Sequence, residues 1–280
     1  TNKKNNYQLD FGAALNNNNE VLYEAAYVTN YKNMQFIWFN QKFSKLSLSF
    51  LALNNGYQYE NLVENKFQVA YLQTIGTYGK WDASKFYGDF GLYAQTGEAA
   101  ITNDKVDVGA YYAGFNLGYK FTNPFKAELG FEYLSGKDQN DTDTKVKSFT
   151  PLFGTNHGFN GLMDYFYVGN HKNSVGLQDF YTKFIYDKNK WQVTLSPHLF
   201  YSAASVYNMT TLEEQDSYLG TEIDLTATYK LDKNFVISGG VSKMFASDTM
   251  EILKGGNNNN CNNWAWVMVS FNPQLFTYKK

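Results

Sequence analysis

The sequence predicts an all-β fold, a transmembrane antiparallel β-barrel, because of three observations. Hydrophobic residues make up 44% of the 280 residues, yet the mean hydropathy is −0.46. Apolar side chains are therefore diluted by polar ones, as a wall between lipid and water requires. Aromatic residues reach 18%, and amphipathic rings concentrate at the two membrane interfaces of such barrels. Segments of about ten residues alternate between apolar and polar side chains, whereas strands of soluble sheets average roughly 5–6 residues.

The alternation is most regular in Phe125–Tyr133, Trp191–Leu199 and Leu219–Tyr229. Because successive side chains of a strand point to opposite faces, the polar positions of such segments predict a lumen. We expect that lumen to be lined by Lys126, Glu128, Asp179, Lys183, Glu222 and Asp224. The same pattern gives about thirteen strands, beginning near Tyr7, Val21, Met34, Leu46, Lys66, Lys85, Val106, Phe125, Gly176, Trp191, Leu219, Phe235 and Asn263.

The links between these strands alternate in length, as periplasmic turns and extracellular loops do in outer-membrane barrels. The short links are Ser44–Lys45, Asp82–Ala83, Asn123–Pro124, Asn189–Lys190 and Asp232–Asn234. The long links run over Asn54–Asn65, Gly97–Lys105, Gly136–Val175, Ala204–Tyr218 and Ser247–Asn262. With the short turns in the periplasm, the chain ends in the periplasm and its first strand begins outside.

The strand number bears on how much of a barrel this chain represents. Bacterial single-chain barrels have an even number of strands, so thirteen predicts that an odd number of strands precedes Thr1. The alternative is a miscount by one, around Met34–Tyr59. The chain opens on polar residues without a signal peptide, which an exported protein requires. We therefore expect residues 1–280 to be one barrel domain that continues toward the N-terminus.

Several stretches resemble the alginate-export family of outer-membrane porins, in family order across nearly the whole chain. The most specific is Ser148–His171, and the others are Tyr93–Gly97, Asn173–Asp179, Leu219–Leu225, Met244–Glu251 and Asn263–Met268. The resemblance implies an 18-stranded barrel, of which five N-terminal strands are missing here. It also implies a channel for anionic oligosaccharide.

The chain departs from that family in the charge of its predicted pore. The founding alginate exporter lines its pore with arginine, whereas all 24 basic residues here are lysine. Lysine and carboxylate side chains are mixed on the predicted lumen face, while a pore selective for polyanions should be mainly positive. A broader porin is the expectation.

The longest link, 136–175, is the main candidate for a functional site, because loops of this length are usually functional or disordered. Its first part is rich in Asp, Asn and Lys, and its second part, Phe149–Tyr167, is rich in aromatic residues and Gly. We predict that the second part folds into the lumen as a constriction, where His157, Asn160 and Asp164 face the solute. The alternative is a loop that plugs and stiffens the wall.

Other chemistries have weaker support in the sequence. His157, His171 and His198 match no metal-ligand spacing, and Asp138, Asp141 and Asp143 lack the spacing of a calcium loop. No Gly-x-Ser-x-Gly motif is present, so neither an enzyme nor a cofactor is expected. The net charge of −2 indicates no nucleic-acid partner. The aromatic strand Asn263–Phe271 resembles the signal that barrel-insertion machinery reads, or is a closing strand with interface aromatics.

Taken with the resemblance, these features predict a bacterial outer-membrane channel for passive diffusion of small hydrophilic solutes, acidic oligosaccharides among them. Its partners would be outer-membrane lipid and the barrel-insertion machinery. The alternative function is a structural barrel subunit with a closed lumen, bound to other proteins of the cell envelope. A soluble all-β carbohydrate binder is disfavoured by the length of the strands.

Overall fold

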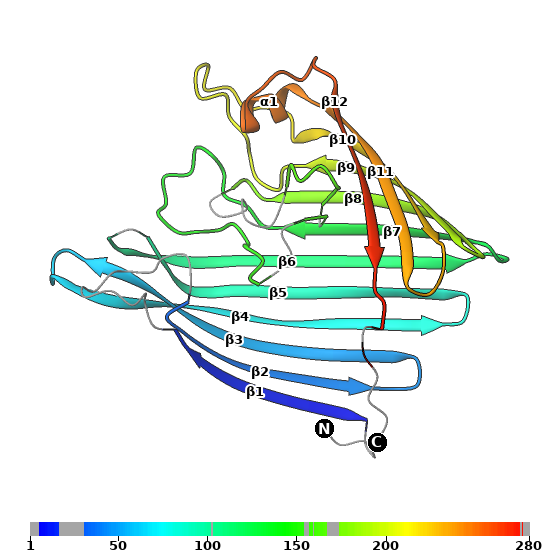
Figure 1. Cartoon of the computed structure of the whole chain (residues 1–280). Helices are drawn as coiled ribbons and strands as arrows, with labels where there is room; N and C mark the ends of the chain where they lie inside the picture. The colour runs from blue at the N-terminus through cyan, green and yellow to red at the C-terminus, as the bar shows by residue number, and fades with distance from the viewer. Residues whose placement is uncertain are drawn as a thin grey trace.

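A computed structural model describes residues 6–16, 31–101, 103–153, 157–158, 160–166, 174–274 and 276. Twelve strands form a single sheet in which each strand pairs antiparallel with the next one along the chain (Figure 1). The elements are β1 (Tyr7–Leu15), β2 (Asn33–Lys42), β3 (Leu46–Asn61), β4 (Lys66–Ala83), β5 (Phe86–Ala100), β6 (Lys105–Lys120), β7 (Phe125–Leu134), β8 (Leu177–Lys188), β9 (Trp191–Tyr201), β10 (Tyr218–Lys230), β11 (Phe235–Ala246), α1 (Asp248–Lys254) and β12 (Asn262–Phe271).

The predicted all-β antiparallel fold is confirmed, and every described strand begins within one residue of a predicted start. The remaining predicted strand, near Val21, lies outside the described residues. β1 pairs directly with β2, with Leu15 opposite Asn33, so the chain leaves β1 and enters β2 at the same end of the sheet. The described strands number twelve, and the expectation that further strands precede Thr1 stays a prediction. The eighteen-stranded barrel stays a prediction.

Two of the long links predicted from the sequence are wrong. β3 continues to Asn61 and β4 begins at Lys66, so Asn54–Asn61 is strand and the link is short. Likewise, β5 ends at Ala100 and β6 begins at Lys105. These four strands are 15 to 18 residues long, which exceeds the roughly 9–11 residues that cross a bilayer. The sheet thus extends beyond the membrane at the end where the other long links lie.

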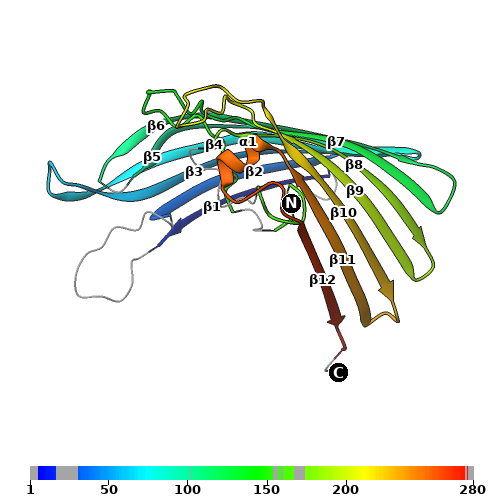
Figure 2. The ribbon, with the colours of Figure 1, turned by 90° about the horizontal axis from the view of Figure 1, so that it is seen from above.

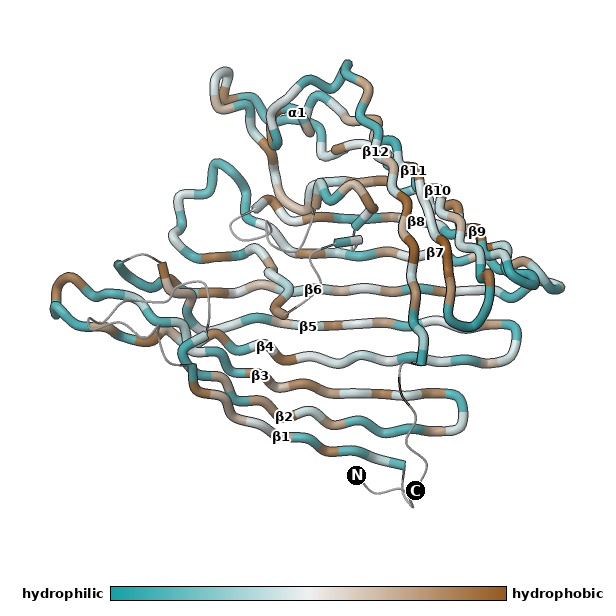
Figure 3. Tube along the Cα trace, in the orientation of Figure 1, coloured by the Kyte–Doolittle hydropathy of each residue, from teal (hydrophilic) through white to brown (hydrophobic). Residues whose placement is uncertain are grey.

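The two faces of the sheet have the reverse polarity of a soluble protein. Hydrophobic and hydrophilic positions alternate along the strands (Figure 3), and the apolar positions are the exposed ones. Each strand contributes at least one large hydrophobic side chain to this exposed face, and register pairs bring them into one continuous belt. One from each strand in order is Phe11, Ile37, Phe50, Ile75, Leu92, Phe115, Leu129, Phe180, Leu195, Leu225, Val241 and Val267. A belt of this extent requires lipid around it.

Aromatic side chains gather where the short turns lie, at one end of the sheet. Phe86 and Tyr119 have ring centroids 4.9 Å apart, and Trp191 and Tyr229 are 4.7 Å apart. The pairs Phe125 with Tyr186 and Phe235 with Phe271 repeat the arrangement on neighbouring strands. This is the aromatic girdle expected at a membrane interface.

The sheet curves into an arc, with α1 on its concave side (Figure 2). Within the described residues, β1 and β12 each have one strand neighbour, so the arc is the wall of an open barrel. Its hydrophobic core lies where the loop between β7 and β8 packs on this side, and includes Phe149, Phe166, Leu177, Phe200 and Met250. No helix among the described residues is long and apolar enough to span a membrane.

Candidate functional site: a loop held on an acidic inner wall

The loop between β7 and β8 crosses the inner face of the sheet. At the start of its aromatic part, Thr150 exchanges two hydrogen bonds with the buried side chain of Gln95 on β5, at 2.8 and 3.1 Å. Further along, the ring of His157 lies edge-on to Trp264 of β12, with centroids 5.6 Å apart. The described parts of the loop therefore contact strands seven positions apart in the sheet.

Five ionisable side chains form a buried cluster beneath this loop. Glu132 extends from β7, Asp179 from β8, His198 from β9, and Glu222 and Asp224 from β10. Strand register explains why they meet: Glu132 lies opposite Asp179, and His198 opposite Glu222. Asp179 and Glu222 are fully buried, and Asp224 and His198 are nearly so.

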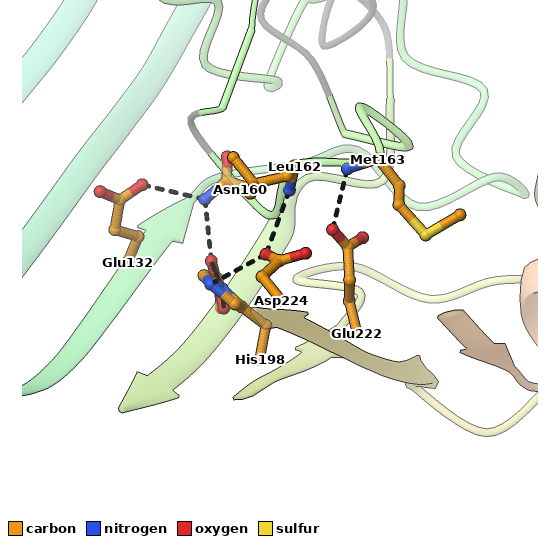
Figure 4. A network of polar contacts seen from close by, with 8 residues as sticks. Glu132, Asn160, Leu162, Met163, His198, Glu222 and Asp224 are labelled. Carbon is orange, nitrogen blue, oxygen red and sulfur yellow. Dashed lines mark hydrogen bonds and ion pairs between the residues drawn. The ribbon is translucent and has the colours of Figure 1, made fainter. Parts of the chain in front are cut away.

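Each of these carboxylates receives a hydrogen bond from the loop or from His198 (Figure 4). The amide nitrogen of Asn160 donates to Glu132 at 3.0 Å and to Asp179 at 3.2 Å. The backbone N–H of Leu162 donates to Asp224 at 3.3 Å, and that of Met163 donates to Glu222 at 2.8 Å. On the wall itself, Nδ1 of His198 lies 3.0 Å from both oxygens of Asp179.

These hydrogen-bond donors offset the cost of burying the carboxylates of the wall. Taking an ionised carboxylate out of water without a donor is costly, and a hydrogen bond to a charged group contributes about 1.5–3 kcal/mol. The loop supplies four such bonds from three residues of one short segment, Asn160, Leu162 and Met163. The loop and the wall therefore stabilise one another, and the site is a latch. We call the four carboxylates with His198, Asn160, Leu162 and Met163 the latch.

Gly161 sits at the tightest point of the latch. Its φ is +77°, a backbone conformation that side chains disfavour. A Cβ on this residue would lie 2.6 Å from the carboxylate carbon of Glu222. The absence of a side chain therefore lets the backbone N–H groups of the next two residues reach the wall.

The structure brings some of the predicted site residues together and separates others. Asn160, Asp179, Glu222 and Asp224 meet in the latch, where the loop covers them. His157 and Asp164 pair with each other at 2.6 Å and stay half-exposed. The three remaining residues lie elsewhere on the wall: Lys126 is 3.5 Å from Asp187, Glu128 accepts a hydrogen bond from Tyr87, and Lys183 lies over the ring of Tyr181.

Sequence reasoning missed two features of this site. Gln95, which binds the loop at Thr150, lies in the stretch Tyr93–Gly97 but was assigned no role in the site. Trp264 and Trp266 were interpreted as interface aromatics or as part of a terminal signal. The register places Trp264 opposite Ser242 and in line with Asp224, on the inner face. Strict alternation along β12 was the signal that could have found this.

In the Asp-rich part of the loop, the carboxylates accept hydrogen bonds from neighbouring groups of the protein. Asp138 accepts from the backbone of Ser205 at 2.7 Å, and Asp141 lies 2.6 Å from the amine of Lys147. The hydrogen bond from Lys147, with one from the backbone of Asp143, holds the pKa of Asp141 below its usual value. In the part of the chain that the structure describes, no group of three His, Cys, Asp or Glu side chains is arranged to hold a metal ion.

Replacing Asn160 with alanine should loosen the latch, because Glu132 and Asp179 then lose a shared donor while staying buried. We expect the free energy of loop docking to fall by about 1.5–3 kcal/mol. Amide hydrogen exchange of residues 160–166 would measure this as faster exchange. Asn258→Ala, on the loop after α1, is the matched control. Unchanged protection at Leu162 and Met163 in the Asn160 variant would contradict the proposed strength of the latch.

Comparisons with known proteins add little beyond the architecture. No family model and no curated protein matches the chain. Among solved structures, the NanC porin is similar over 86% of this chain and 93% of its own, with 9% identity and a TM-score of 0.40. The copper transporter OprC is similar over 78% of this chain and 38% of its own, with 12% identity and a TM-score of 0.41. Both scores are too low to carry an argument about function, so the assignment to antiparallel barrel walls comes from the sheet itself.

Proposed function

We propose that this chain forms the wall of a bacterial outer-membrane channel through which small hydrophilic solutes diffuse passively. The observation that carries the proposal is the loop held across the inner face by buried hydrogen bonds to four carboxylates. A loop fixed in this way narrows the passage to a defined size. The exposed apolar belt supports a lipid-embedded wall around it.

In the proposed mechanism, passage depends only on the size and the charge of the solute. Solute moves down its gradient, the loop sets the size limit, and the mixed lysine and carboxylate side chains of the wall set a weak charge preference. Because each of the four carboxylates accepts a hydrogen bond from the loop, we assign them to positioning the loop rather than to a reaction. We assign the protein no catalytic step and no cofactor.

Acidic oligosaccharides are the solute class that the resemblance to the alginate-export family implies. The latch argues for a broader range, because the carboxylates beneath the loop outnumber the single histidine among them. The negative potential of these carboxylates does not concentrate polyanions in the passage. We therefore propose a porin of broad specificity rather than a dedicated exporter of acidic polymers.

A structural subunit with a closed lumen is the second candidate. It is favoured by the hydrophobic core that the loop forms against the wall, in which Phe149 and Phe166 are buried. A loop packed this well stiffens the wall, and its contacts extend over several strands. Loop-bound envelope proteins would then be the partners.

Single-channel recording of the full-length protein in a planar bilayer separates the two candidates. Stable open steps that scale with salt concentration are the result we expect from a passive channel. Correct folding is checked in the same sample by heat-dependent migration on a gel. Silence from correctly folded protein would refute the channel and favour the structural subunit.

A further inference from the structure

Two tryptophans on β12 face the interior. Trp264 and Trp266 alternate with Ala265 and with Val267, which is 80% exposed on the apolar belt. The register places Trp266 opposite Gly240, where a Cβ would lie 2.6 Å from the indole nitrogen. The missing side chain lets the indole lie against the wall. The indole N–H of Trp266 is buried and has no acceptor within the described residues.

The loop places a polar rim beside this pair of rings. The rings of Trp264 and Trp266 are 6.3 Å apart and tilted by 37°, so together they form a bent aromatic surface. His157 contacts the edge of that surface, and Asp164 holds the imidazole at 2.6 Å. The backbone N–H of Gly158 donates to the other carboxylate oxygen at 3.1 Å. Both His157 and Asp164 keep about a third to a half of their side chains exposed.

A pocket of about 260 Å³ lies next to the same strand, toward the end of the sheet with the long loops. It is lined by residues of α1 and the loop that follows, by Tyr165, and by Asn262 of β12. Asn262 and Trp264 are two residues apart and point to the same face. Three asparagines, Asn257, Asn258 and Asn262, supply amide groups to the lining, and Glu251 and Lys254 supply one charge of each sign.

This combination matches one class of ligand. A sugar ring presents an apolar C–H face that packs on a flat aromatic ring, and hydroxyl groups around its edge. Amides, imidazole and carboxylate can each donate to or accept from hydroxyls, and binding sites commonly join aromatic surfaces to a few placed polar groups. Asp164 and Glu251 offset the cationic groups nearby, so the surroundings hold no excess of positive charge to attract a polyanion.

We propose that Trp264 and Trp266, with His157, Asp164 and the asparagine-lined pocket, form a binding subsite for neutral oligosaccharides at the entrance of the passage. This proposal rests on the proposed channel function and names its solute class. Sugars are bound at the subsite before they pass the loop. The sequence resemblance implies anionic sugars, and this subsite assigns the opposite preference.

Current block by defined sugars tests the subsite on the full-length protein in planar bilayers. Maltohexaose is the neutral probe, and a galacturonic acid oligomer of the same length is the acidic probe. We expect maltohexaose to block at the lower concentration. Trp264→Ala should raise its half-blocking concentration at least tenfold, and Trp264→Phe should restore part of the affinity. Trp191→Ala, on the apolar face, is the matched control and should change nothing.

Three outcomes would overturn the subsite: tighter block by the acidic probe, equal block in Trp264→Ala and the unaltered protein, or no block by maltohexaose in an open channel. The last leaves the channel itself standing. If the folded protein shows no open steps, the channel proposal fails separately. Tryptophan fluorescence of the detergent-folded protein, titrated with maltohexaose, then decides the subsite. A saturable change lost in Trp264→Ala supports it, and no change refutes it.

Discussion

Substituting Gly161 with valine should release the loop from the wall and raise the single-channel conductance severalfold. The residue has a φ of +77°, and holding a β-branched side chain there costs about 1–3 kcal/mol. The new side chain would also overlap the Glu222 carboxylate, which lies 2.6 Å from the Cβ position. The hydrogen bonds that Leu162 and Met163 donate to the wall would then be lost. Single-channel recording gives the conductance directly.

Gly255→Val is the control for that experiment. Gly255 also has a positive φ, of +72°, but no atom lies within 4 Å of its Cβ position. It is the C-cap of α1 and takes no part in the hydrogen bonds of the latch. The control therefore carries the backbone strain without a clash at the latch, and its conductance in the absence of sugar should match that of the unaltered protein. A Gly161 variant with unchanged conductance, in protein that still folds, would show that the loop does not limit the passage.

Placing a lysine at Leu225 should destabilise the folded protein in a lipid bilayer by about 2–4 kcal/mol. Leu225 lies near the middle of β10 and is exposed on the apolar belt. A lysine near the bilayer midplane costs this much in barrels because its charge is taken into hydrocarbon. Urea-dependent unfolding in phospholipid vesicles would measure the change.

Thr226→Lys is the paired substitution on the opposite face of the same strand. Thr226 lies opposite Gly240, in line with the inner-face tryptophans, so a lysine there points into the lumen. We expect its cost to be much smaller than that of Leu225→Lys. Equal costs at the two positions would contradict the assignment of the faces, and with it the membrane-embedded sheet.

The sequence alone determined the strands of this protein. Alternation with a period of two is a local property, so it gave the start of each described strand within one residue. It also gave the inward direction of Glu222 and Asp224, since their apolar neighbours Ile223 and Leu225 are exposed. The same alternation was harder to follow in the long pair β3 and β4, because those strands leave the membrane and their ends no longer have one apolar face.

The tertiary structure decided what the loop and the aromatic residues do. The meeting of Glu132, Asp179, Glu222 and Asp224 depends on the register of several strand pairs, which no local pattern fixes. The donors that these carboxylates need come from a loop whose contacts span the sheet from β5 to β12. Trp264 likewise gains its place beside His157 only when the sheet curves and the loop crosses it. A buried carboxylate cannot be solvated by water, so it needs a hydrogen-bond donor from the protein. Those donors are distant in the sequence, and only the folded chain brings them close.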